Sequence, residues 1–313
     1  MQPRSALDGQ ASGMMLVLCA IWGLQQVAIK SIATDISPIL QIGVRSGVAA
    51  LLVAALMFWR SEQPRAGDSH WLPGLAIGGL FGLEYLLVGE GLRHTTASHM
   101  VIFLYTSPIF AALGLHWKLP AERLKAPQWG GIALAFLGIV VAFSGHGSGG
   151  ASSLLGDALG LAAGAAWGAT TVVVRTSRLS SAPATQTLLY QLLGACVLLV
   201  AAALAMHQAS VNLTPTVLAN LTYQVLVMSF ASLLAWFWLL RTYLASRLGV
   251  LAFLTPLYGI GFGVWLLDEP LEANFLMGAG LVMVGILCVS GYEWFVQRQA
   301  VQASGRHDSP THE

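Results

Sequence analysis

The chain has 313 residues, of which 56% are hydrophobic and only 9% are charged. A soluble domain carries about a quarter charged residues, so this composition excludes an ordinary water-soluble fold. The formal net charge of +1 says little about partners, and we expect no nucleic acid among them.

Apolar runs of about 20 residues recur along the whole chain, and each is long enough to cross a hydrocarbon core of about 30 Å as a helix. We therefore predict an all-α integral membrane protein with ten transmembrane helices. The expected spans are residues 13–33, 38–59, 71–93, 96–117, 127–145, 154–174, 184–206, 217–240, 246–267 and 273–295.

The ends of the chain are short tails, residues 1–12 and 296–313. The first span follows a tail with a single Arg and precedes nine further spans, so we expect a retained helix and not a cleaved signal peptide. Three cysteines lie within apolar runs and show no CxxC spacing: Cys19, Cys196 and Cys288. This placement predicts buried, unpaired thiols, and we expect no disulfide, metal site or cofactor.

The distribution of basic residues predicts the orientation of the chain. With the N-terminus in the cytoplasm, only Lys30 and Arg93 face outward, which follows the positive-inside rule. Ten crossings then place both termini in the cytoplasm and turn the acidic loop with Asp268, Glu269 and Glu272 outward. The cytoplasmic residues are Arg4, Arg60, Arg65, Lys118, Arg123, Lys125, Arg175, Arg178, Arg241, Arg247, Arg298 and Arg306.

The chain contains an internal repeat. Residues 20–30, AIWGLQQVAIK, return 145 positions later as residues 165–175, AAWGATTVVVR, so that Trp22 corresponds to Trp167. At similar offsets, residues 96–108 match 244–256, and residues 124–138 match 271–285. We therefore expect two five-helix repeats, residues 13–145 and 154–295, joined by a short linker at 146–153.

Because each repeat holds an odd number of spans, the second copy enters the membrane from the opposite face, and the repeats are inverted. This arrangement is typical of secondary transporters, in which substrate binds near the midplane and two halves rock around it. A duplication that serves packing alone is the alternative.

Pro108 and Pro256 occupy corresponding positions in the middle of two spans. Proline lacks an N–H, so the two residues free the carbonyls of Leu104 and Ala252 and bend each helix unless the Ser107 or Thr255 hydroxyls or water compensate. We expect hinges at these prolines, and a kink with only a packing role is the alternative.

Glycines recur every four residues in the sixth span and in the third, which predicts close helix packing in lipid. They are Gly156, Gly160, Gly164 and Gly168, and Gly74, Gly78 and Gly82. The closing span of each repeat is smooth and apolar, and we expect both closing spans at the periphery.

Aromatic and polar side chains near mid-span are candidates for binding a substrate. Trp22 and Gln25 lie within one helical turn, and Trp167 repeats this placement in the sixth span, so the two sets could converge on a midplane cavity. A buried packing role is the alternative for each. Further candidates at comparable depth are Tyr85, Phe103, Tyr105, Tyr190, Trp236 and Tyr258. Trp238 is about 200° from Trp236 on a helix, so at most one of them lines a cavity easily.

Ionisable residues within spans are costly and therefore functional candidates. Arg45 lies at a depth that permits a pair with Glu84 or with Glu90, and the acid left over could bind a proton or a substrate cation. For the Arg45 pair, structural glue and ligand contact both remain open. We expect His94 and His99 to be solvated near the outer surface.

Several motifs resemble the EamA branch of the drug/metabolite transporter superfamily. They are WG at 22–23, YTSPIFAALG at 105–114, AERL at 121–124, QWGGIALAFLGIVV at 128–141, LTPLYGIGFGVWLLDEPL at 254–271 and MGAGLVMVGIL at 277–287. The resemblance covers residues 13–295 and implies a basket-like bundle of inverted repeats that exports small metabolites.

Within that branch, Trp22, Tyr85, Tyr105 and Trp167 are most similar to residues of bacterial aromatic amino acid exporters. Small four-helix multidrug relatives carry a membrane-embedded Glu in their first helix, where this chain has Gln25. Their proton coupling therefore cannot be carried over. Glu84 or Glu90 could substitute, or transport could be uncoupled.

The sequence thus predicts a secondary transporter in a bacterial inner membrane that exports small amphipathic solutes, with aromatic amino acids as the favoured substrate. Drugs or other metabolites, such as nucleosides or sugar derivatives, are the alternative within the same fold. An intramembrane enzyme is disfavoured because HExxH and GxSxG are absent from the sequence. An ion channel is disfavoured because an inverted monomer does not readily supply rings of charge. The oligomeric state and any coupling ion stay open.

Overall fold

The structure is a computed structural model that describes residues 9–62, 71–120, 123–144, 150–243, 248 and 251–307. Regular structure in these residues is helical, apart from one isolated bridge between Ile36 and Val211. Among them, nine helical stretches are long and apolar enough to cross a membrane, and a shorter apolar helix supplies a tenth. The prediction of an all-α, ten-span membrane protein is confirmed.

The first repeat contains six helical pieces because its fourth span is broken in two. They are α1 Gly9–Ser31, α2 Pro38–Trp59, α3 Trp71–Gly91, α4 Ala97–Leu104, α5 Ser107–Lys118 and α6 Ala126–Phe143. Local chemistry sets several of the helix starts. The Ser37 hydroxyl accepts a hydrogen bond from Leu40 N ahead of α2, and Thr96 caps α4 in the same way through His99 N.

The second repeat has the same order of spans, but its third span changes its helical form. Its elements are α7 Gly150–Thr176, the 3₁₀ turn η2 Arg178–Ser181, α8 Ala184–Ala205, α9 Pro215–Tyr223, the π-helical segment η3 Gln224–Ala231, α10 Ser232–Thr242, α12 Leu254–Leu267 and α13 Ala273–His307. The first part of the expected ninth span, 246–267, lies partly outside the described residues.

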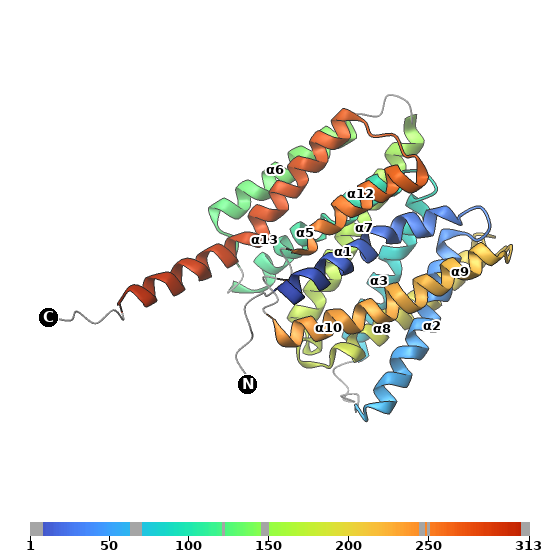
Figure 1. The fold of residues 1–313 in the computed structure, drawn as a ribbon, viewed down its shortest axis with the longest axis horizontal. Coiled ribbons are helices and arrows are strands. Elements are labelled where there is room, and N and C mark those ends of the chain that lie inside the picture. The colour runs from blue at the N-terminus through green and yellow to red at the C-terminus, as the bar shows by residue number, and fades with distance from the viewer. Residues whose placement is uncertain are drawn as a thin grey trace.

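The closing helices of the two repeats, α6 and α13, lie side by side along one edge of the bundle (Figure 1). A Cβ at Gly131 would lie 2.8 Å from the carbonyl oxygen of Gly285, and one at Gly285 would lie 2.5 Å from that of Gly131. Gly138 and Gly278 approach each other in the same reciprocal way. Since the internal repeat matches Gly131 to Gly278 and Gly138 to Gly285, these contacts are what two inverted copies produce.

The glycine ladders pack as predicted. Gly78 in α3 faces the backbone of α8, and a Cβ there would lie 2.7 Å from the Tyr190 carbonyl oxygen. Gly164 in α7 faces α4 at 2.7 Å from the carbonyl oxygen of Phe103. Backbones that approach this closely gain dispersion energy that the hydrophobic effect cannot supply in lipid.

Each mid-span proline follows a break in its helix. Tyr105 and Thr106 separate α4 from α5 just before Pro108, and Phe253 forms a turn just before the α12 residues that lead to Pro256. In the first break, the Thr106 hydroxyl donates a hydrogen bond to Phe103 O at 2.6 Å. This bond goes to the carbonyl of Phe103 and not to that of Leu104, which Pro108 frees.

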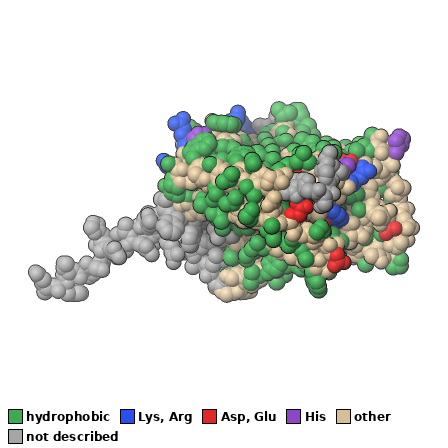
Figure 2. Space-filling view, turned by 90° about the horizontal axis from the view of Figure 1, so that it is seen from above, with side chains coloured by type: hydrophobic (Ala, Val, Ile, Leu, Met, Phe, Trp, Pro, Cys, Tyr) green, Lys and Arg blue, Asp and Glu red, His purple; other side chains and the backbone are tan. Residues whose placement is uncertain are grey.

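Hydrophobic side chains cover most of the face seen in Figure 2, as expected for a surface in contact with lipid. Several exposed tryptophans lie near the ends of spans, where membrane proteins carry an aromatic belt. Trp59, Trp71, Trp117 and Trp129 lie at predicted cytoplasmic ends, and Trp265 lies at a predicted outer end. The expectation that all three thiols are buried is wrong, because Cys196 is half-buried and Cys288 is exposed, and only Cys19 is buried.

Candidate functional site

The two repeat tryptophans each contact another aromatic ring edge to face. Trp22 lies 5.6 Å from Trp236, between ring centroids, and its Nε1 donates a hydrogen bond to the Ser232 hydroxyl at 3.2 Å. Trp167 lies 5.4 Å from Tyr105, at the break between α4 and α5. Trp238, in contrast to Trp236, exposes 43% of its surface, so only one of that pair turns inward.

The glycine after each tryptophan shows why the motif has this form. A Cβ at Gly23 would lie 2.9 Å from Thr255 O and Gly259 N of α12. One at Gly168 would lie 2.9 Å from Ser107 O and Ala111 N of α5. The WG motif thus joins the first span of each repeat to the proline-containing span of the other repeat.

Arg45, in α2, is a buried charge and is only 4% exposed. Its Nη1 donates a hydrogen bond to Gln224 Oε1 at 3.3 Å, and its Cζ lies 5.2 Å from the centre of the Tyr85 ring. The Tyr85 hydroxyl in turn accepts a hydrogen bond from Gln25 Nε2 at 3.1 Å. These contacts bring together α1, α2, α3 and η3.

The expected ion pairs of Arg45 are wrong. Glu90 is paired with Arg93 at 2.9 Å through both carboxylate oxygens, at the outer end of α3. Within the described part of the chain, no nitrogen–oxygen pair within 4.0 Å joins Arg45 to Glu84. Depth along a helix placed these groups at similar levels but does not fix direction around the helix, so neither acid forms a direct ion pair with Arg45, although Glu84 is near enough to interact with it electrostatically.

Gln224 is a site residue that the sequence analysis missed. Its Nε2 donates to Gln41 Oε1 at 2.9 Å and to Asn220 Oδ1 at 2.8 Å, so both amide hydrogens are used and Oε1 is left to face Arg45. Gln224 is also the first residue of η3, and π-helical turns within α-helices are frequent at functional sites. The only sequence indication was an amide in an apolar span.

Glu84 is the second buried charge and is 3% exposed. Among the described residues, no hydrogen-bond donor reaches its Oε2. Buried polar atoms ordinarily have a partner, so an unpartnered carboxyl oxygen in a span calls for a proton or a cationic ligand.

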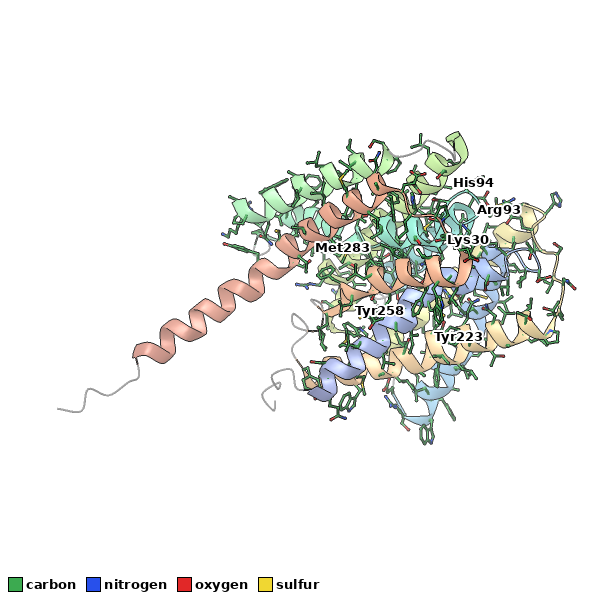
Figure 3. The ribbon with its side chains drawn as sticks, turned by 45° about the horizontal axis from the view of Figure 1, so that its top comes forward. Lys30, Arg93, His94, Tyr223, Tyr258 and Met283 are labelled. Carbon is green, nitrogen blue, oxygen red and sulfur yellow. The ribbon has the colours of Figure 1, made fainter. Side chains whose placement is uncertain are left out.

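The remaining candidates lie apart from Arg45. Phe103 is fully buried and packs 4.9 Å from the Phe143 ring, and the Tyr190 ring covers Gly74 at the cytoplasmic end of α3. Tyr258 stacks at 6.0 Å on Phe262 and packs against Gly23; it projects from α12 beside α1 (Figure 3).

One outer-surface expectation is also wrong. His99 is 7% exposed, and its Nδ1 lies 2.9 Å from Asp157 Oδ2, so it is not a solvated histidine. In the acidic loop, Glu269 is 7% exposed, whereas its neighbour Asp268 is exposed.

Two hollows are lined by described residues. One of about 360 Å³ lies in the cytoplasmic half and is lined by Ser107, Pro108, Ala111, Ala112, Leu115, Leu124, Gln128, Trp167, Thr171, Val289 and Ser290. The other, of about 370 Å³, lies in the outer half and is lined by Leu24, Val27, Ala28, Ser31, Asn220, Tyr223, Leu266 and Leu267. Each is large enough for a small organic solute.

Known proteins share this architecture over most of their length. The chain is 27% identical to a "Probable amino-acid metabolite efflux pump" of Escherichia coli (strain K12), over 92% of this chain and 97% of the relative. It is 24% identical to the "Uncharacterized transporter YoaV" of Bacillus subtilis, over 85% of this chain and 91% of that protein. A solved structure titled "Crystal structure of protein" superposes with a TM-score of 0.61 at 19% identity, over 89% of this chain and 95% of that one, which shows the fold alone.

Both halves of the chain match one family separately, at residues 11–144 and 154–291. The double match agrees with the reciprocal contacts between the closing helices of the two repeats. The chain belongs to the EamA-like transporter family.

Proposed function

We propose that this transporter exports aromatic amino acids across a bacterial inner membrane. The observation that carries the proposal is the state of Arg45, a guanidinium buried within a span whose described polar neighbours, Gln224 and Tyr85, are both neutral. The E. coli relative, named as a probable amino-acid metabolite efflux pump, supports an amino-acid substrate.

Burying a guanidinium in the membrane costs free energy because the charge loses its hydration. A buried arginine is therefore a candidate for a functional role. Arginine presents five N–H donors in a planar fork that matches a carboxylate in two parallel hydrogen bonds. Gln224 occupies one donor of Arg45, so the remaining donors are the natural site for a substrate α-carboxylate. Gln41 and Asn220 hold Gln224 in this orientation.

The α-ammonium group of the same substrate would bind Glu84. Its Oε2 has no donor among the described residues, and an ammonium supplies three. Arg45 and Glu84 would then recognise the two ends of one zwitterion. In the absence of substrate, a proton on Glu84 would remove the buried charge, and such a group could couple export to proton entry.

An aromatic side chain would rest against the rings of Trp22, Trp236, Tyr105 and Trp167. Aromatic pairs prefer edge-to-face contacts, which are worth about 0.5–1.5 kcal/mol beyond their buried area. Movement at the breaks before Pro108 and Pro256 would let the two halves rock around the bound solute.

The experiment compares three solutes in proteoliposomes. Tryptophan has both charges, tryptamine lacks the carboxylate, and indole-3-propionate lacks the ammonium. We expect uptake of tryptophan that the two analogues compete for weakly, and we expect Arg45→Gln to lower tryptophan flux at least about 100-fold, as for loss of a buried charged contact worth about 3 kcal/mol.

Arg93→Gln is the matched control, because Arg93 is an exposed arginine paired with Glu90. Tryptophan flux through Arg45→Gln equal to that through Arg93→Gln would defeat the assignment of Arg45. Transport of uncharged solutes without competition by amino acids would instead indicate a drug or metabolite exporter of the same fold.

A further inference from the structure

At the outer end of the bundle, the carboxylate of Glu269 reaches from the loop after α12 to the N-terminal end of α4. Glu269 Oε1 accepts a hydrogen bond from Ala97 N at 2.6 Å, and Oε2 accepts from Ser98 N at 3.0 Å and from the Ser98 hydroxyl at 2.7 Å. Lys30 Nζ lies 3.6 Å from Oε1. An acid at the N-terminal end of α4 satisfies free N–H groups and interacts favourably with the helix dipole.

The backbone is shaped to bury this acid. Asp268 adopts a left-handed conformation with φ of 52°, which ends α12 and turns the next residue inward. Gly263 then leaves the space that Glu269 occupies, because a Cβ at Gly263 would lie 2.5 Å from Glu269 Oε2 and would also meet Ser98 Oγ. The position of Glu269 is therefore built into the fold.

A second polar contact crosses the same end of the bundle. Asp157, which is 0% exposed in α7, accepts a hydrogen bond from the Thr95 hydroxyl and lies 2.9 Å from Nδ1 of His99. The His99 ring stacks on Phe275 of α13 with centroids 3.8 Å apart. Lys30 also donates to Thr95 O, and Figure 3 shows Lys30, Arg93 and His94 at this end of the molecule.

Apart from the bond between Lys30 and Thr95, these contacts join one repeat to the other. Lys30, Thr95, Ser98 and His99 belong to the first repeat, whereas Asp157, Glu269 and Phe275 belong to the second. When two inverted halves rock, contacts between them at one end form in one state and break in the other. Such contacts supply the difference in free energy between the states.

The cytoplasmic end of the molecule is packed differently at the position that corresponds to Phe275 in the internal repeat. The offset of 147 that relates the closing spans matches Phe275 to Gln128. Phe275 is fully buried and fills its site, whereas Gln128 borders the hollow of about 360 Å³ in the cytoplasmic half. On the α6–α13 side, the bundle is thus packed at its outer end and hollow at its cytoplasmic end, whereas the outer hollow of about 370 Å³ lies on the other side, between α1, α9 and α12.

We propose that Glu269 is the latch of an outer gate, and that in this structure the latch is closed between α4 and the end of α12. For that end to open, the Glu269 carboxylate leaves the N-terminal end of α4 and is hydrated in the outer water. Lys30 is 29% exposed in its side chain, so water already reaches the edge of the latch. The proposal rests on transport by the EamA family and is independent of which solute is carried.

The test measures access to a residue beneath the latch. Val101 is fully buried in α4, one helical turn below Ser98. Val101→Cys is made in a background with Cys19, Cys196 and Cys288 replaced by Ala. The rate of labelling by a membrane-impermeant maleimide is measured in spheroplasts, which expose the outer face. We expect slow labelling in this background and at least about tenfold faster labelling with Glu269→Gln, which corresponds to about 1.4 kcal/mol.

Two further variants make the result specific to the latch. Gly263→Ala displaces the carboxylate without changing any charge, and we expect it to accelerate labelling as well. Asp268→Asn is the matched control, because Asp268 is an exposed neighbour and Asn tolerates its left-handed backbone. It should leave the rate unchanged.

Labelling of both Glu269→Gln and Gly263→Ala at the Asp268→Asn rate would overturn the proposal. Thermal unfolding of each purified variant identifies any that are misfolded. If either Glu269→Gln or Gly263→Ala is misfolded, the labelling rate of the other one tests the proposal. Labelling needs no substrate. A gate that responds as expected in a protein that fails to carry tryptophan would therefore leave the latch in place and reject only the proposed substrate.

Discussion

The third spans of the two repeats hold the bundle together by different means. In the first repeat, α3 is a continuous helix whose Gly74, Gly78 and Gly82 press against the Tyr190–Leu198 side of α8. In the second repeat, residues 215–242 contain no glycine, pass through a π-helical segment, and dock by hydrogen bonds from Asn220 to Ala28 O and between Gln224 and Gln41.

The two interfaces differ in how much substitution they tolerate. A glycine-packed interface depends on close backbone approach and tolerates little change. An interface held by side-chain amides can be altered residue by residue, and its polar groups are already at mid-membrane depth. The second repeat's third span accordingly carries two groups of the proposed site, Gln224 and Ser232.

The largest effect is expected from breaking the glycine interface. Gly78→Leu would push a side chain into the Tyr190 carbonyl of α8, and overpacking of this kind costs about 1–3 kcal/mol or more. We expect the melting temperature of the purified protein to fall by about 5 °C or more. Gly79→Leu is the control, because nothing lies within 4 Å of a Cβ at that neighbouring position. Equal melting temperatures for the two variants would mean that the α3–α8 contact does not support the fold.

A smaller effect on stability and a larger one on transport are expected in the polar interface. Gln224→Leu keeps the volume and removes the hydrogen bond to Arg45, and a hydrogen bond to a charged group is worth about 1.5–3 kcal/mol. We expect tryptophan flux to fall about tenfold or more. The melting temperature should fall less than with Gly78→Leu, through the bonds that Gln41 and Asn220 lose. Thr222→Val is the control, since the exposed Thr222 hydroxyl bonds only the Leu218 carbonyl of its own helix among the described contacts. Unchanged flux through Gln224→Leu would remove Gln224 from the site.

The smallest effect is expected at Trp22. Trp22→Phe keeps an aromatic ring and loses the hydrogen bond to Ser232, which is worth about 1 kcal/mol. The KM for tryptophan should rise a few-fold at constant kcat, and Ser232→Ala should do the same. The double variant should be no worse than either single one, because both remove the same bond. Additive losses, or an equal loss in the exposed control Trp238→Phe, would contradict this role.

Hydropathy and internal repeats predicted the scaffold because lipid imposes simple rules. The length of each apolar run predicted the ten spans, and the four-residue spacing of glycines predicted close contacts between helices. Both predictions depend only on the geometry of a single helix. The repeat offset also located Trp22 and Trp167, whose neighbouring glycines make equivalent contacts in the two copies.

The partners of the charged residues could not be predicted in this way. Depth along a span does not fix direction around the helix, so Arg45 was assigned to acids and is bonded to Gln224. The left-handed turn at Asp268 that buries Glu269 has no hydropathy pattern. Asp157 lies near the end of its span and was overlooked, although it holds His99 inside the bundle.

Binding of L-tryptophan to the purified protein, measured by titration calorimetry beside tryptamine, tests the role of Arg45 most directly. We expect the unaltered protein to bind tryptophan and to bind tryptamine far more weakly. Arg45→Gln should remove this preference, and Arg93→Gln should keep it. Equal affinity of the unaltered protein for the two solutes would contradict the claim that Arg45 receives the substrate carboxylate.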